Sequence, residues 1–304
     1  MHNGTLITIR DKELYVEVHG SSNLPPLLYL HGGPGESCFD FSYHQAERLE
    51  DNFMVIAIDQ RGVCRSEAVT EEENFGLCDL IEDCEAIRKH FGLESWSVLG
   101  HSFGGYLGVH YATQYPEAID HLLLECPTFD FTLTSRSLMK KTSRLLEKFS
   151  NQEAAIECMA IAQNEKIKNR ELAELYTEYS DLLGEDRMEI YIHNDEQPTD
   201  YSYYSEAKWD ELYDKSEVHY NLLREEGEIF DSLLPVLHEL SMPTLLLTGE
   251  HDPVTCQEQI TVFKEVVKNG AIYHFSNSGH TPHDEEADHF AYAITQFIGD
   301  KRED

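Results

Sequence analysis

A serine stands between glycines in the segment Gly100–Gly104, which matches the pattern Gly-x-Ser-x-Gly. The segment follows a short apolar run at residues 95–99 and precedes a run with helical spacing, so we expect a sharp turn between a strand and a helix. Glycines flank such a turn because larger side chains would collide there. Ser102 would then project its hydroxyl from the sheet edge as a nucleophile. The competing interpretation is a structural glycine-rich turn.

A serine hydroxyl is a weak nucleophile and needs a base, which a third group orients. In this arrangement the acid and then the histidine follow the serine in the chain. Asp252 and His280 each follow a short apolar run, at the sheet edge where Ser102 is expected. We therefore predict that these three residues form a catalytic triad. The nearest competitors are Glu250 for the acid and His283 for the base.

Attack by serine on a carbonyl creates an oxyanion, which needs preorganised N–H donors. The segment His-Gly-Gly-Pro-Gly, residues 31–35, follows another buried apolar run. Consecutive glycines let the backbone approach a reacting carbonyl closely. We expect the N–H groups of Gly33 and Phe103 to form the oxyanion hole; the alternative for residues 31–35 is a plain Gly/Pro turn.

These positions require an α/β fold with a mostly parallel sheet. Short apolar runs end at residues 30 and 58, and apolar residues recur with helical spacing between Asn74 and Gly92. Such alternation predicts a parallel sheet covered by helices on both faces. From about residue 128 to 238 only helical patterns occur, and strand patterns then return. The predicted organisation is a core of residues 1–127 and 239–304 with a helical cap at 128–238.

The amino-acid composition indicates which classes of binding partner to expect. The 304 residues include 57 acidic and 23 basic ones, a net charge of −34. We expect neither nucleic acid nor a membrane as a partner, because both attract basic surfaces. Seven scattered cysteines, no signal-peptide pattern and no metal-ligand spacing predict a cytoplasmic protein with free thiols and no cofactor or metal. The sequence does not indicate an oligomeric state.

The motifs HGGPG, DQRG, GHSFGG, GEHD and SGH resemble, in order and rough spacing, those of α/β-hydrolases of the proline iminopeptidase type. This resemblance covers about residues 1–127 and 239–304. It implies an α/β-hydrolase fold and a serine peptidase that removes N-terminal residues from short peptides. It also implies the triad of Ser102, Asp252 and His280 and the oxyanion hole of Gly33 and Phe103.

Two departures from that family favour an aminopeptidase broader than a strict proline enzyme. Cys64 stands where the family usually has glycine after its Asp-Gln-Arg-Gly motif, with Arg61 of that motif expected to be buried and ion-paired. His101 and Phe103 replace the family's small and aromatic residues around the nucleophile.

The family binds the substrate's ammonium group with cap carboxylates. The segment Ser216–Tyr220 resembles a stretch of the family's cap, and this resemblance implies that Glu217 binds the ammonium group. The alternative is that Glu217 is a solvated acid. Residues 128–238 hold 24 acidic and 12 basic residues, no denser in negative charge than the rest, although 15 of the acids and 4 of the bases fall within 185–231. The alternatives to an aminopeptidase are a small-molecule esterase, amidase or lactonase, and a ligand-binding receptor with a residual triad.

Overall fold

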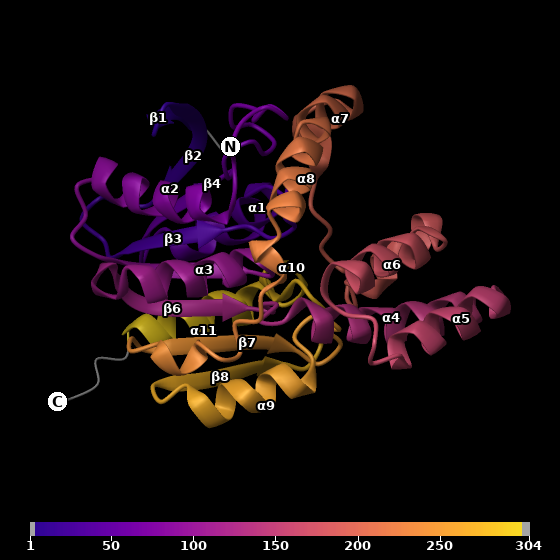
Figure 1. Cartoon of the computed structure of the whole chain (residues 1–304). Coiled ribbons are helices and arrows are strands. Elements are labelled where there is room, and N and C mark those ends of the chain that lie inside the picture. The colour runs from indigo at the N-terminus through magenta and orange to yellow at the C-terminus, as the bar shows by residue number, and fades with distance from the viewer. Residues whose placement is uncertain (1–3, 300–304) are drawn as a thin grey trace.

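The computed structural model describes residues 4–299 and contains one eight-stranded sheet, with strand order β1-β2-β4-β3-β5-β6-β7-β8 (Figure 1). The first two strands run antiparallel to their neighbours, and the other pairs are parallel. This is the mostly parallel sheet that the sequence predicted. The strands are β1 (Thr5–Ile9), β2 (Lys12–His19), β3 (Pro26–Leu30), β4 (Met54–Ile58), β5 (Trp96–His101), β6 (Ile119–Glu125), β7 (Thr244–Gly249) and β8 (Gly270–Phe275).

Helices cover both faces of the sheet. One face carries α2 (Leu77–His90), α3 (Phe103–Gln114) and α9 (Gln257–Val266), and the other carries α1 (Phe39–Leu49) and α11 (Ala287–Gly299), with the short α10 (Pro282–Glu285) beside α1. The central strands are apolar throughout because both of their faces are buried. In β3, for example, Leu28 and Leu30 face one layer while Leu27 and Tyr29 face the other.

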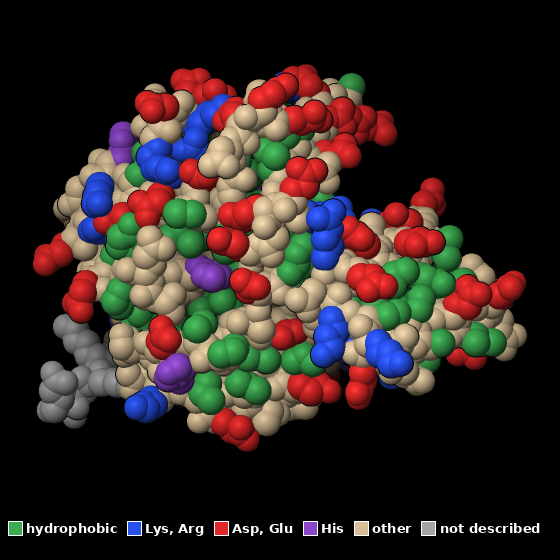
Figure 2. All heavy atoms as spheres, viewed as in Figure 1, with side chains coloured by type: hydrophobic (Ala, Val, Ile, Leu, Met, Phe, Trp, Pro, Cys, Tyr) green, Lys and Arg blue, Asp and Glu red, His purple; other side chains and the backbone are tan. Residues whose placement is uncertain are grey.

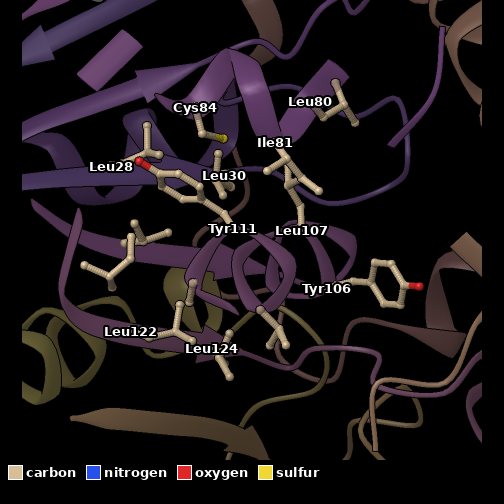
Figure 3. Close-up of a cluster of buried hydrophobic side chains, with 14 of the residues drawn as sticks. Leu28, Leu30, Leu80, Ile81, Cys84, Tyr106, Leu107, Tyr111, Leu122 and Leu124 are labelled. Atoms are coloured by element: carbon tan, nitrogen blue, oxygen red, sulfur yellow. The ribbon is translucent and has the colours of Figure 1, made fainter. Parts of the chain in front are cut away.

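The larger hydrophobic cluster lies between the sheet and the α2–α3 layer. Figure 3 shows Ile81 and Cys84 of α2 directed toward Leu107 and Tyr111 of α3, with Leu30 of the sheet nearby. Each of these side chains is at least 95% buried. Burial stabilises the fold by roughly 25 cal/mol for each Å² of apolar surface removed from water. This packing holds in place the strand ends that carry the candidate site.

The chain between β6 and β7 has only helices in its regular structure. They are α4 (Phe131–Lys148), α5 (Gln152–Gln163), α6 (Asn169–Asp181), α7 (Glu206–Asp214) and α8 (Ser216–Glu226), with 3₁₀ turns at Gly184–Ile190, Tyr201–Tyr203, Glu228–Phe230 and Leu237–Glu239; a further such turn, Pro116–Ala118, precedes β6.

The helices α4, α5 and α6 project from the core and share a hydrophobic cluster of their own (Figure 1). By contrast, Leu223 of α8 and Ile229 pack into the main core. The division of the chain into a core and a separate cap domain at residues 128–238 stays a prediction. None of the helices within residues 4–299 is long and apolar enough to cross a membrane.

Candidate active site

Ser102 occupies a strained turn at the end of β5. Its φ of 53° and ψ of −117° lie in a region that residues other than glycine rarely adopt. A Cβ on Gly100 would lie 2.2 Å from the carbonyl oxygen of Gly104, and one on Gly104 would lie 2.0 Å from that of Leu30. Both flanking glycines are therefore required by close backbone contact, as the sequence analysis expected. The turn leaves Ser102 partly exposed at the start of α3.

Asp252 and His280 lie together beyond the ends of β7 and β8. The Nδ1 atom of His280 is 2.9 Å from Oδ1 of Asp252, whose carboxylate also accepts the N–H groups of Val254 and Thr255, each at 2.9 Å. This arrangement fixes the tautomer with the proton on Nδ1 and leaves Nε2 as an acceptor. The His280 ring lies 4.7 Å from the ring of His101, the neighbour of Ser102. Among residues 4–299, no hydrogen bond joins Ser102 Oγ to His280.

The two competitors have other partners. The carboxylate of Glu250 is 2.8 Å from Nε2 of His274 and is exposed. His283 is buried, with Nδ1 2.9 Å from Oε1 of Glu125. Burial alone would lower the pKa of His283, but the Glu125 carboxylate raises it to about 9, and the paired histidine holds the pKa of Glu125 near 2 against its own burial. This pair is therefore ionised at neutral pH beneath the nucleophile turn.

The loop predicted to form the oxyanion hole, residues 31–35, lies beside Ser102. A Cβ on Gly32 would be 3.0 Å from Cβ of Ser102, and Gly33 is exposed with a φ of 108°. Phe103 is the first residue of α3, so its N–H has no partner within the helix. The backbone N–H of Gln60 donates to Nε2 of His31 at 2.9 Å, and its side chain donates to the His31 carbonyl at 3.0 Å. Gln60 thereby holds the loop at residues 31–35 in place.

The Asp-Gln-Arg-Gly motif at residues 59–62 supports the site through buried ion pairs. The guanidinium of Arg61 binds the Asp83 carboxylate at 2.6 and 2.7 Å, which confirms the expectation of a buried pair. Burial would raise the pKa of Asp59, but Arg65, at 2.7 Å, holds it below its usual value. Cys64 is fully buried with a φ of 42°, a conformation that glycine adopts more readily than other residues.

Two supporting residues were missed by the sequence analysis. The carbonyl of Tyr191, in the segment between β6 and β7, accepts the N–H of His280 at 2.8 Å. The carboxylate of Glu285 accepts the N–H groups of Gly279, Thr281, His193 and Asn194 at 2.8 to 3.2 Å. No spacing pattern could have indicated the contact of Tyr191 with His280 or those of Glu285 with His193 and Asn194, because they join segments that are distant in the chain.

The carboxylates near the loop differ in their surroundings. Glu217 is exposed in the first turn of α8 and has no hydrogen bond or ion pair to residues 4–299, although its neighbour Ser216 contacts Gly35. Glu36, one position after Gly35, is open to solvent yet surrounded by enough protein that desolvation, together with Asp40, raises its pKa to about 6. The electrostatic effect of His280 lowers the pKa of the same carboxyl, so the two groups are close.

Two side-chain groups could hold a metal ion. The candidate ligand atoms of His101, Glu125 and His283 lie within 4.8 Å of one another, as do those of Cys126, Asp252 and His280. Both groups combine residues from different strand ends, so the sequence spacing did not indicate them. A metal in the second group would occupy the acid and the base of the predicted triad.

The chain matches the family model described as alpha/beta hydrolase fold over residues 25–287. The chain belongs to the α/β-hydrolase fold family. This α/β-hydrolase is 34% identical over 127 residues to the proline iminopeptidase of Neisseria gonorrhoeae, a match covering 40% of this chain and 39% of that relative. It thus spans well under half of that relative's length. Identity to the proline iminopeptidase of Saccharolobus solfataricus is 25% over 278 residues, covering 90% of this chain and 84% of the relative.

Solved structures confirm the fold. The proline iminopeptidase of Mycobacterium smegmatis superposes with a TM-score of 0.71 at 20% identity over 98% of both chains. A bacterial membrane phospholipase A gives 0.73 at 20% identity, covering all of this chain and 87% of the other. Likeness at this identity shows the fold alone, because the same scaffold carries many activities.

Proposed function

We propose that this α/β-hydrolase is a serine aminopeptidase that releases N-terminal residues from short peptides through an acyl-enzyme. The observation that carries the proposal is the Asp252–His280 pair at 2.9 Å, with the His280 ring packed beside the strained Ser102 turn and the glycine loop opposite. The proline iminopeptidase relatives support the choice of substrate class.

In the proposed mechanism Nε2 of His280 takes the proton of Ser102 Oγ as the oxygen attacks the substrate carbonyl. The N–H groups of Gly33 and Phe103 stabilise the oxyanion, and Asp252 stabilises the imidazolium. The imidazolium then donates its proton to the leaving amine, which departs and leaves the acyl-enzyme. Water repeats the sequence, with His280 again as base, and restores the serine.

An aminopeptidase must bind the substrate's ammonium group, and a desolvated ammonium requires a paired charge. Glu36 suits this role because its pKa is raised by burial and by Asp40, so a bound cation would stabilise its charged form. Glu217 remains the second candidate, because its neighbour Ser216 lies beside Gly35. Acidic side chains gather over α7 and α8 (Figure 2), where they would attract cationic substrates.

The test is a substrate panel of amino-acyl aryl amides with free or blocked amino groups, together with short-chain aryl esters. We expect free-amine amides to be cleaved with the highest kcat/KM, and Ser102→Ala to abolish all turnover. Glu36→Gln should raise KM for free-amine substrates about tenfold or more, or about 1.4 kcal/mol, and leave esters unchanged. Glu217→Gln, measured in parallel, assigns the role between the two carboxylates.

Equal cleavage of blocked and free amides would reject the aminopeptidase and leave an esterase or amidase on the same scaffold. Full turnover by Ser102→Ala would reject serine catalysis. Failure to hydrolyse any activated ester or amide would favour a receptor with a residual triad.

A further inference from the structure

A hollow of about 720 Å³ lies where α4 passes the loop that follows β7. Asp252 contributes to its lining, but Ser102 and His280 do not, so the hollow is separate from the surface that would bind the scissile bond. Its volume lies within the range of small-molecule sites.

One face of α4 supplies an unusual concentration of positive charge to this hollow. In a chain of 57 acidic and 23 basic residues, α4 carries five basic residues and one acidic residue. Lys140, Lys141, Arg144 and Lys148 line the hollow, and their spacing places them along one side of the helix. Figure 2 shows Lys and Arg side chains over this part of the molecule, where the helices leave the core.

The carboxylates around the hollow neutralise only one cation of this face, Lys148, which pairs with Glu189 at 2.5 Å. The other two carboxylates have histidine partners: Glu250 pairs with His274 at 2.8 Å and Asp252 with His280 at 2.9 Å.

The other three cations are left without a carboxylate partner. Lys141 donates to the carbonyl oxygen of His251 at 2.9 Å. Neither Lys140 nor Arg144 makes an ion pair or a hydrogen bond with any residue from 4 to 299. Three cationic groups are thus available to a ligand.

Two imidazoles complete the site on the side opposite α4. The rings of His193 and His251 stack with centroids 3.5 Å apart and an interplanar angle of 23°. Burial, and His193 after it, lower the pKa of His251, and an anion placed beside this ring would favour its protonated form. The ring nitrogens add donors that match the chemistry of the α4 face.

We propose that this hollow binds a small molecule bearing two or more phosphate groups. The three available cations, from Lys140 to Arg144, extend over about 6 Å of helix at 1.5 Å per residue, and their three positive charges exceed the charge of about −2 that a single phosphate group carries. Arg144 offers the planar fork that binds phosphate oxygens in pairs, and the lysines supply point charges. An anionic membrane surface fits less well, since the hollow is concave and the rest of the protein is strongly acidic.

The probe for the test is inorganic tripolyphosphate, with binding measured by isothermal titration calorimetry on the full chain at low and physiological ionic strength. We expect saturable one-site binding that Lys140→Gln/Arg144→Gln weakens at least about tenfold. Both residues are exposed, so the double variant should keep its fold, which circular dichroism checks. The matched control is Lys264→Gln/Lys268→Gln, which removes two exposed charges at and just after the end of α9 and should change affinity less than about twofold.

The remaining measurements separate the sources of anionic charge. Orthophosphate and citrate should each bind at least about tenfold more weakly than tripolyphosphate; equal binding of citrate would reject phosphate recognition. Non-saturable binding, or equal weakening by the control variant, would overturn the site. Ser102→Ala should bind the probe as the wild type does, so this result is independent of the proposed hydrolase activity.

Discussion

Asp252→Asn tests whether the acid and the base work as the geometry indicates. In the structure Oδ1 faces Nδ1 of His280 and the N–H of Val254, while Oδ2 accepts the N–H of Thr255. An asparagine has only one oxygen. If that oxygen takes the Oδ1 position, the amide NH₂ faces the N–H of Thr255, a donor–donor contact that costs about 1–3 kcal/mol. If it takes the Oδ2 position, the NH₂ faces His280 and imposes the wrong tautomer.

The wrong tautomer places a proton on Nε2 of His280, which then cannot accept the proton of Ser102. We expect kcat to fall about 10³- to 10⁴-fold, which corresponds to about 4–5.5 kcal/mol of lost transition-state stabilisation. The assay is hydrolysis of an activated aryl ester with the purified variant, together with covalent labelling of Ser102 by a fluorophosphonate. Both rates should fall together.

Glu250→Gln is the matched control, because it makes the same chemical change two residues earlier on an exposed carboxylate that binds His274 instead. It should keep kcat within about twofold of the wild type. An Asp252→Asn protein that folds and retains a kcat within tenfold, or an equal loss in Glu250→Gln, would refute the assigned roles.

Three further predictions concern stability, measured by urea denaturation. Glu285→Ala removes an acceptor shared by four backbone N–H groups and should lower the free energy of unfolding by about 3–5 kcal/mol; a loss below 1 kcal/mol would contradict its role. Asp83→Asn leaves Arg61 buried without its counter-charge and should cost a similar amount, with Lys208→Gln on the exposed face of α7 as a neutral control. Stability should also fall as pH decreases from 6.5 to 4, because the unfolded chain takes up protons there while burial keeps four native histidines neutral. The carboxyls of Glu36 and Asp284, with pKa raised to about 6 mainly by burial, oppose part of this loss, and a flat profile would contradict the prediction. The four histidines, whose pKa values burial lowers to between about 3 and 4, are His31, His44, His101 and His219.

Much of the scaffold could be predicted from local patterns. The helical spacing between Asn74 and Gly92 corresponds to α2, which ends just before Gly92, whose φ of 66° suits glycine. Apolar runs that end in glycine-rich turns became central strands, because burial on both faces demands continuous apolar sequence. The positions of Asp252 and His280 followed from the same rule, since parallel strands end at one edge.

Contacts between distant segments could not be predicted. The Tyr191 carbonyl and the Glu285 carboxylate bind backbone N–H groups, and which groups they reach depends on how the segment between β6 and β7 packs on the core. The raised pKa of Glu36 likewise arises from burial by surrounding segments.

The local distribution of charge on the surface could not be predicted from the sequence either. The average over residues 128–238 concealed the basic face of α4, because net charge adds up residues that point in opposite directions.

The hydrogen bond from the His280 N–H to the carbonyl of Tyr191 has a consequence for engineering. The segment between β6 and β7 anchors the backbone of His280, and a Cβ on Gly279 would lie only 2.1 Å from the same carbonyl. A shortened protein made by excising this segment would lose the anchor, and a chimaera that grafts another relative's segment would need to restore a carbonyl at the same place. Any movement that carries residue 191 away from the core would break this hydrogen bond and release the backbone of His280.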